Sequence, residues 1–128
     1  MRGYLIDTHV AIWFFNGSDT LSKTADRIIC DFSNPIYISI VSVWELAIKT
    51  GIGKMKFDGK IAGFIRLAEK NEITILPIKP THLTALESLP LIHRDPFDRL
   101  LIATAIDEQM SLISADKNIA QYDVPLIW

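Results

Sequence analysis

Apolar residues occur along this chain in two kinds of run, one with the spacing of strands and one with the spacing of helices. Short runs rich in β-branched and aromatic residues predict strands, and longer stretches with apolar residues three and four positions apart predict amphipathic helices. The predicted strands are Tyr4–Ile6, Ile36–Ile40, Ile73–Leu76, Ser111–Ser114 and a final edge strand at Val124–Ile127. The predicted helices cover residues 10–15, 22–32, 42–49, 59–70, 80–89 and 98–109.

Strands and helices alternate from one end of the chain to the other. This order predicts an α/β fold, with a mostly parallel sheet covered by helices on both faces. The chain has 128 residues and no internal repeat, low-complexity tract or linker, so we expect one domain over residues 1–128.

The sequence also predicts which of several side chains are buried and which are at the surface. We expect Phe32 and Ile106 to point inward from their helices, and Cys30, Trp13 and Trp44 to be core residues. The three histidines are not spaced like a zinc pair, so His9, His82 and His93 are interpreted as surface or loop residues.

Composition excludes several classes of protein. The single cysteine rules out an internal disulfide and a cysteine-based zinc cluster, and it fits a reducing cytoplasm. No apolar run approaches the roughly 18 residues of a membrane span, and the amino terminus lacks the features of a signal peptide. We therefore expect a cytoplasmic protein that does not associate with membranes.

Charge gives a mixed indication about nucleic acids. The formal net charge of −2 provides no general basic field. One stretch is locally basic, however, because Asp58 alone opposes its four lysines. These are Lys49, Lys54, Lys56 and Lys60. They form either a solvated loop or a basic rim for a phosphate backbone.

The most informative polar residues are four acids placed where apolar segments stop. They are Asp7, Glu45, Asp98 and Asp116. Ligands of open α/β sheets bind in the crevice outside the carboxyl ends of the strands, and carboxylates that converge there repel one another unless a cation lies between them. A ligand set made only of oxygen atoms suits Mg²⁺ or Mn²⁺.

Each acid also has a purely structural interpretation. Asp7 and Asp116 are candidate N-caps of the helices that follow them, and Asp98 is a candidate partner of a helix dipole. Glu45 completes a capping-box pattern with Ser42, and Asp95 is a candidate turn residue before Pro96. The joint position of the acids at one edge of the predicted sheet favours the functional interpretation.

Four segments together resemble a known family. They are residues 5–9 (Leu-Ile-Asp-Thr-His), 42–49 (Ser-Val-Trp-Glu-Leu-Ala-Ile-Lys), 93–103 (His-Arg-Asp-Pro-Phe-Asp-Arg-Leu-Leu-Ile-Ala) and 114–116 (Ser-Ala-Asp). In these segments the chain resembles the PIN-domain nucleases, and more narrowly the VapC-like toxins of type II toxin–antitoxin pairs. The resemblance extends over essentially the whole chain, and the Asp-Pro-Phe-Asp-Arg run is its most specific part.

The resemblance implies a three-layer α/β/α sandwich and a metal-dependent ribonuclease. The family's catalytic, metal-binding acids carry over onto Asp7, Glu45, Asp98 and Asp116. Asp98 takes the third position rather than Asp95, because it directly opens the Leu-Leu-Ile-Ala helix, and Asp95 is left as a residue that could assist. The cofactor is Mg²⁺ or Mn²⁺, with Asp7 and Asp98 as direct ligands and the other two acids bound directly or through water.

The resemblance also implies partners and secondary site residues. Thr8, Lys49, Arg99 and Ser114 are candidate substrate contacts, with Lys49 alternatively a partner that keeps Glu45 ionised. The expected partners are an RNA substrate, a cognate antitoxin and a second copy of the chain. We expect an antitoxin arginine to enter the acidic crevice, with the flanking surface near Trp13 and Phe64.

Two other functions compete with this one. The first is a PIN-like module that binds RNA or a partner without cutting, which the presence of all four acids argues against. The second is a receiver-type signalling domain, which needs paired acids after its first strand and an aspartate after its third. Here Asp7 stands alone, and no aspartate ends Ile73–Leu76.

Overall fold

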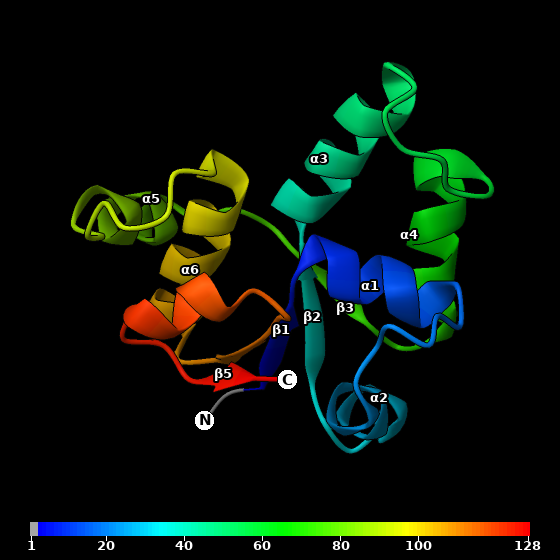
Figure 1. Ribbon diagram of the computed structural model, residues 1–128, viewed down its shortest axis with the longest axis horizontal. Coiled ribbons are helices and arrows are strands. Elements are labelled where there is room, and N and C mark those ends of the chain that lie inside the picture. Colours follow the sequence, from blue (N-terminus) through cyan, green and yellow to red (C-terminus); the bar gives the residue numbers. More distant parts are fainter. Residues whose placement is uncertain (1–2) are drawn as a thin grey trace.

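The computed structural model describes residues 3–128 and forms five parallel strands between two layers of helices (Figure 1). Met1 and Arg2, the first residues of the expected domain, lie outside the described residues. The strands are β1 (Tyr4–Ile6), β2 (Ile36–Ser39), β3 (Thr74–Leu76), β4 (Ser111–Ile113) and β5 (Leu126–Ile127). Their order in the sheet is β3-β2-β1-β4-β5, so β5 is an edge strand as predicted.

The helices are divided between the two faces of this sheet (Figure 1). Four cover one face: α1 (Thr8–Phe15), α2 (Lys23–Cys30), α3 (Ile40–Gly51) and α4 (Lys60–Lys70). The other face is covered by α5 (Pro80–Glu87), α6 (Pro96–Glu108) and the 3₁₀ helix η1 (Lys117–Gln121). The α/β/α sandwich expected from the sequence is confirmed.

The short strands serve both layers because successive side chains point to opposite faces. In β1, Leu5 packs under α6 while Ile6 packs with α1 and α3. Leu112 and Ile113 of β4 divide in the same way. All four are fully buried, and full burial of such a side chain contributes about 1.5–3 kcal/mol. This two-sided burial explains why the strands read as continuous apolar runs.

The position of β1 in the middle of the sheet creates the crevice. The chain leaves β1 toward β2 on one side and returns to β4 on the other side. Ile6 is aligned with both Ile38 and Ile113, so the three strands end within one residue of the same level. A sheet with this change of direction binds its ligands just beyond the carboxyl ends of the strands on either side.

Three helices begin earlier than the sequence predicted. Helix α1 starts at Thr8 and not at Val10. Helix α3 starts at Ile40, where the Ser39 hydroxyl caps it by accepting from the Val41 N–H at 3.0 Å. Helix α6 starts at Pro96, a residue suited to the first helical position, and Asp95 is its N-cap. The capping box proposed for Ser42 and Glu45 is therefore wrong, since both residues lie inside the helix.

Several core assignments are also wrong. Cys30 ends α2 and is exposed, whereas Ala25 and Ile29 of the same helix are buried. Phe32 lies beyond the end of that helix and is 62% exposed, and Ile106 is 36% exposed on the outer face of α6. Trp44 is 57% exposed on the outer face of α3 and packs its ring edge-on against Phe97 of α6. Trp13 is half-buried against the core, between the rings of His9 and Trp128.

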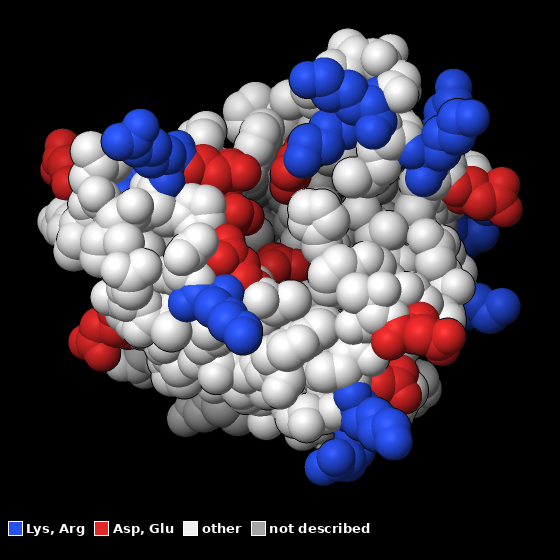
Figure 2. Space-filling model, in the orientation of Figure 1, with Lys and Arg blue, Asp and Glu red and all other residues white. Residues whose placement is uncertain are grey.

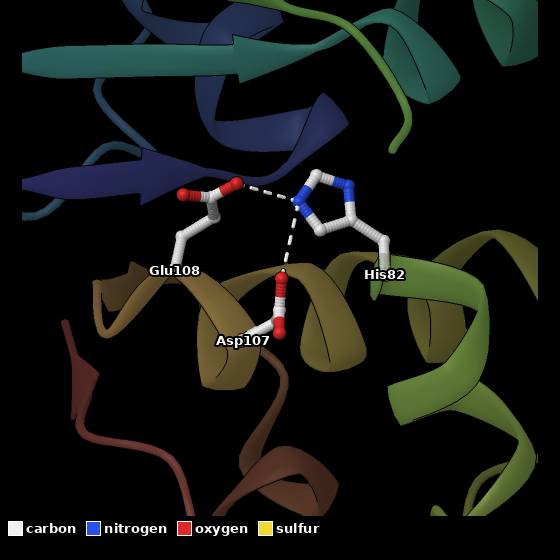
Figure 3. A group of neighbouring side chains, drawn as sticks. All are labelled: His82, Asp107 and Glu108. Atoms are coloured by element: carbon white, nitrogen blue, oxygen red, sulfur yellow. Dashed lines mark hydrogen bonds and ion pairs between the residues drawn. The ribbon is translucent and has the colours of Figure 1, made fainter. Parts of the chain in front are cut away.

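His82 is fully buried, so its assignment to the surface is wrong. Its Nδ1 accepts from the Lys79 backbone N–H at 3.0 Å, which places the imidazole proton on Nε2, 2.7 Å from Glu108 Oε2 (Figure 3). Lys79 Nζ lies 3.0 Å from the same carboxylate oxygen, and Asp107 is more distant, at 3.7 Å from Nε2. This His82 clip ties the start of α5 to the end of α6. His9, by contrast, is exposed as expected.

The helices of residues 3–128 include none with the length and apolar character that a membrane crossing requires.

Candidate active site

Asp7 follows β1 directly and projects from the centre of the sheet edge. Its backbone is extended, and its Oδ1 accepts from the Val10 N–H at 2.8 Å, so Asp7 is the N-cap of α1. Only 8% of the residue is exposed. Burial raises the pKa of Asp7; the Ser114 hydroxyl and the Val10 N–H counteract this by bonding the ionised form, and the Asp116 charge adds to the rise. The capping and functional interpretations are thus compatible.

Glu45 reaches the crevice from the first half of α3 and is 4% exposed. Its two oxygens have different partners. Thr8 Oγ1 lies 2.8 Å from Oε1, and Lys49 Nζ lies 2.6 Å from Oε2. Thr8 Oγ1 is also 2.8 Å from Ser42 Oγ. Because an ionised carboxylate only accepts, Thr8 donates to Glu45 and accepts from Ser42. Glu45 is therefore held in place by an alcohol and an ammonium group.

Asp98 lies in the first turn of α6, on the opposite side of the crevice from α3. Burial and the neighbouring Asp95 raise its pKa to about 7, with further contributions from the charges of Asp7 and Glu45, while His93 opposes the shift. The carboxylate of Asp98 is thus close enough to the other acids to sense them. Asp95 is engaged elsewhere: its Oδ1 accepts from the Phe97 and Asp98 N–H groups at 2.8 and 3.4 Å.

Asp116 completes the group from the loop after β4. Its Oδ1 caps η1 by accepting from the Asn118 N–H at 3.0 Å, as the sequence suggested, and its own N–H donates to Ser114 Oγ at 3.1 Å. Its Oδ2 lies 2.8 Å from His93 Nε2. Burial acts to raise the pKa of Asp116, but the hydrogen bonds from His93 and Asn118 outweigh it and hold the pKa below its usual range.

His93 is the residue that sequence reasoning missed. It is half-buried, with Nε2 also 3.3 Å from Asp98 Oδ2, so it is a residue of the crevice and not a free surface histidine. The only local signal was its position two residues before Asp95. Its contact with Asp116 spans 23 positions and was not visible in the sequence.

The charges of the site form a distinct pattern on the surface. Figure 2 shows acidic side chains lining a hollow between α3 on one side and α6 with η1 on the other, with basic side chains beside it over α3 and over η1. Lys54, Lys56 and Lys60 are exposed in the stretch after α3, whereas Lys49 is half-buried against Glu45. Lys49 thus occupies the position expected of a partner of Glu45.

Thr8, Ser114 and Arg99 are the remaining candidate residues of the site. Thr8 and Ser114 are buried at the floor of the crevice and bond its carboxylates. Arg99 directs its guanidinium away from the acids, to the carbonyl oxygens of Pro90 and Leu89 at 2.9 and 3.3 Å. It therefore fastens the loop before α6, and a contact of Arg99 with substrate stays a prediction.

The residues present fit a divalent metal ion. The carboxylates supply the hard oxygen ligands that Mg²⁺ and Mn²⁺ prefer. Ligand atoms of His93, Asp98 and Asp116 lie within 4.8 Å of one another. Burial raises the pKa values of Asp7 and Asp98, and the charges of neighbouring acids raise them further. A bound divalent cation would favour the ionised form of both carboxylates.

Comparisons with known proteins agree with this geometry. The family model described as PIN domain matches residues 4–125. Ribonuclease VapC22 of Mycobacterium tuberculosis (strain ATCC 25618 / H37Rv) is 27% identical over 127 residues, which are 98% of this chain and 95% of that protein.

Solved structures have the same fold. VapBC2 from Rickettsia felis bound to a DNA fragment from their promoter matches with a TM-score of 0.71 and 15% identity, over 97% of this chain and 96% of that one. VapBC-1 from nontypeable Haemophilus influenzae matches with a TM-score of 0.66 and 16% identity, over 97% and 96%. FitAcB from Neisseria gonorrhoeae matches with a TM-score of 0.63 and 17% identity, over 98% and 96%. With four acids gathered at the centre of such a sheet and a family match over almost its whole length, the chain belongs to the PIN domain family.

Proposed function

We propose that this chain is a Mg²⁺- or Mn²⁺-dependent endoribonuclease and the toxin of a type II toxin–antitoxin pair, with residues 1–128 as one PIN domain acting in the cytoplasm. The observation that carries the proposal is the convergence of Asp7, Glu45, Asp98 and Asp116 on one hollow. Kinship with a ribonuclease that aligns over 98% of this chain supports the reaction class. No other nucleophile constellation competes with the acids among residues 3–128.

Each acid has a role that its contacts support. Asp7 and Asp98 would hold the metal directly, because burial and the charges of neighbouring acids raise both pKa values, and a bound cation would offset that repulsion. Glu45 and Asp116 would hold it directly or through water. A bound divalent ion supplies activation of the attacking water and neutralisation of the scissile phosphate. Thr8, Lys49 and Ser114 bond the carboxylates and hold their orientation, so the side chains need little rearrangement when RNA binds.

The exposed lysines after α3 are the proposed contacts to the RNA backbone. Lys54, Lys56 and Lys60 stand on the α3 side of the hollow and bond no acid among the described residues. Phosphate contacts of this kind give affinity that falls steeply with salt and carries no sequence information. The identity of the RNA is therefore set elsewhere in the site.

A cognate antitoxin is the proposed protein partner. The three solved relatives described above include two named as VapBC complexes. A partner arginine entering the hollow would pair with Asp7 or Asp98 through its planar fork and displace the metal. The flanking surface expected near Phe64 needs correction, since Phe64 is fully buried; Trp13, half-buried, remains available.

A second copy of the chain is the other proposed partner. The outer face of α3 carries an exposed apolar stripe with the four-residue spacing of one helix face: Ile40, Trp44, Ile48 and, just beyond the helix, Ile52. An exposed apolar patch of this kind marks an interaction surface. Because Glu45 and Lys49 are on the same helix, a homodimer through this stripe would place the two hollows near the shared interface.

The alternative is a PIN module that binds RNA without cutting it. The other alternative, a receiver-type signalling domain, is excluded because the chain belongs to the PIN domain family. Cleavage of RNA by the purified wild-type protein, with Asp7→Asn and Asp98→Asn as variants, separates the two remaining functions. We expect cleavage only with Mg²⁺ or Mn²⁺ and none by either variant. Full activity in excess chelator, or from both folded variants, would leave the binding module as the better description.

Competition between metal and antitoxin tests the partner proposal. A peptide from the carboxyl-terminal part of the antitoxin encoded beside this protein should bind less tightly in saturating Mn²⁺, and less tightly to Asp7→Asn, because the arginine and the metal share one anionic site. Titration calorimetry measures both affinities. Equal affinity in all three conditions would place the inhibitory contact outside the hollow.

A further inference from the structure

The imidazole of His93 lies between two of the proposed metal-binding carboxylates. Its Nε2 is 2.8 Å from Asp116 Oδ2 and 3.3 Å from Asp98 Oδ2. Asp98 comes from α6 and Asp116 from the loop after β4. His93 is therefore the group that connects the acids of two separate elements.

The tautomer of His93 is set by its other nitrogen. Nδ1 lies 3.1 Å from the Asp95 backbone nitrogen, whose N–H can only donate, so Nδ1 accepts and carries no proton in the neutral ring. The proton of the neutral imidazole is then on Nε2, directed at the carboxylates. Nε2 with a proton has no lone pair for a metal. Coordination through Nε2 would require a proton on Nδ1, facing the Asp95 N–H.

The backbone of His93 is held independently of its ring. The His93 and Ile92 N–H groups donate to the Tyr122 hydroxyl oxygen at 2.7 and 3.1 Å. Tyr122 is buried in the core below α6. The loop is fastened further by Arg99, whose guanidinium bonds the Pro90 carbonyl. Changes to the His93 side chain consequently leave the anchoring of the loop intact.

We propose that His93 is a positioning residue that donates its Nε2–H to Asp116, lies against Asp98, aligns the two carboxylates for a divalent ion, and does not itself bind the ion. This inference rests on the proposed function, because the ion is the one that the four acids would hold. Hydrogen-bonded partners of this kind fix the orientation of ligating carboxylates, and their loss typically lowers metal affinity or activity about 10- to 100-fold.

Two substitutions at His93 distinguish the effect of the Nε2–H donor from the effect of the rest of the imidazole. In His93→Gln, the amide nitrogen stands the same number of bonds from Cβ as Nε2 and can still donate to Asp116. In His93→Asn, the amide oxygen can still accept from the Asp95 N–H, but the amide nitrogen is one bond closer to Cβ than Nε2 is and does not reach Asp116. Mn²⁺ affinity, measured from the free-ion signal in electron paramagnetic resonance, should fall about 10- to 100-fold in His93→Asn and recover to within about threefold of wild type in His93→Gln.

The chain offers a matched control in His82. Its Nδ1 also accepts from a backbone N–H, at 3.0 Å, and its Nε2 also donates to a carboxylate, at 2.7 Å, but the carboxylate is Glu108 in the clip between α5 and α6. His82→Asn therefore makes the same chemical change outside the hollow. Its Mn²⁺ affinity should match that of the wild type, and a melting curve for each variant confirms that it is folded.

Nitrogen NMR of the imidazole reads the tautomer without any measurement of activity. The His93 ring should be the Nε2-protonated form both in the metal-free protein and with Mg²⁺ bound. A proton on Nδ1 with Mg²⁺ present, or a folded His93→Asn variant that binds Mn²⁺ as tightly as wild type, would overturn the inference. So would a wild-type protein that binds no Mn²⁺.

Parallel cleavage assays keep the two proposals distinguishable. If the His93 variants change Mn²⁺ affinity as expected while the wild type cuts no RNA, the positioning role stands and the proposed function fails. If the wild type cuts RNA while Mn²⁺ affinity is indifferent to His93, the function stands and the positioning role is wrong.

Discussion

At the scale of single residues, Glu45 is where a structural and a functional interpretation most clearly separate. It caps no helix, and its oxygens are bound by Thr8 and Lys49 at the wall of the acidic hollow. Glu45→Gln keeps an oxygen for Thr8 and removes the negative charge. We expect RNA cleavage and Mn²⁺ affinity to fall strongly. The free energy of unfolding should change by no more than about 1 kcal/mol, because Lys49 is partly exposed and can turn to solvent.

The control for this change is Glu69→Gln, which removes the same charge from an exposed position on α4. That variant should cut RNA like the wild type. Cleavage at the wild-type rate by Glu45→Gln as well would show that the carboxylate is dispensable and that Glu45 only supports its neighbours.

At the scale of elements, the position of α5 depends on the His82 clip. His82→Ala removes an acceptor for the Lys79 N–H and the donor to Glu108, and it leaves a cavity in a fully buried position. We expect a loss of about 2–4 kcal/mol in the free energy of unfolding, measured by urea denaturation. Thr81→Ala, on the exposed side of the same helix, should change it by less than about 0.5 kcal/mol. Equal midpoints for the two variants would mean that α5 is held by its apolar contacts alone.

At the scale of the whole molecule, the acidic hollow couples stability to pH and metal. The folded state keeps the proton of Asp98 up to a pKa of about 7, whereas the unfolded chain loses it near 3.8, so the metal-free protein should lose stability as pH rises between these values. The raised pKa of Asp7 acts in the same direction. Melting temperatures in chelator should fall from pH 5 to pH 8, and millimolar Mg²⁺ should restore more stability at pH 8 than at pH 5.

Asp98→Asn removes one source of this slope. The variant should have a flatter dependence of melting temperature on pH than the wild type and a smaller response to Mg²⁺. An unchanged slope, or no response of the wild type to Mg²⁺ at either pH, would argue that the carboxylates do not share one ion.

The sequence alone determined the layer architecture and the location of the acidic hollow, because both follow from local patterns. Strand runs such as Tyr4–Ile6 and Ser111–Ile113 were apolar throughout because both of their faces are buried, and acids placed after such runs must meet where parallel strands end. The start of α3 could not be predicted in the same way, because Ser39 and Ser42 are both residues that commonly cap helices. The position where β2 ends selects Ser39.

Only the tertiary structure decided which partner each polar side chain has and which side of a helix faces solvent. The bonds of His93 to Asp116, His82 to Glu108 and Thr8 to Glu45 join residues 23, 26 and 37 positions apart, and nothing in the intervening sequence specifies them. Trp44 was predicted to be buried because it stands in an apolar run. Helix α3 has more apolar surface than its neighbours cover, and its packing against α1, α4 and α6 determines which part stays exposed.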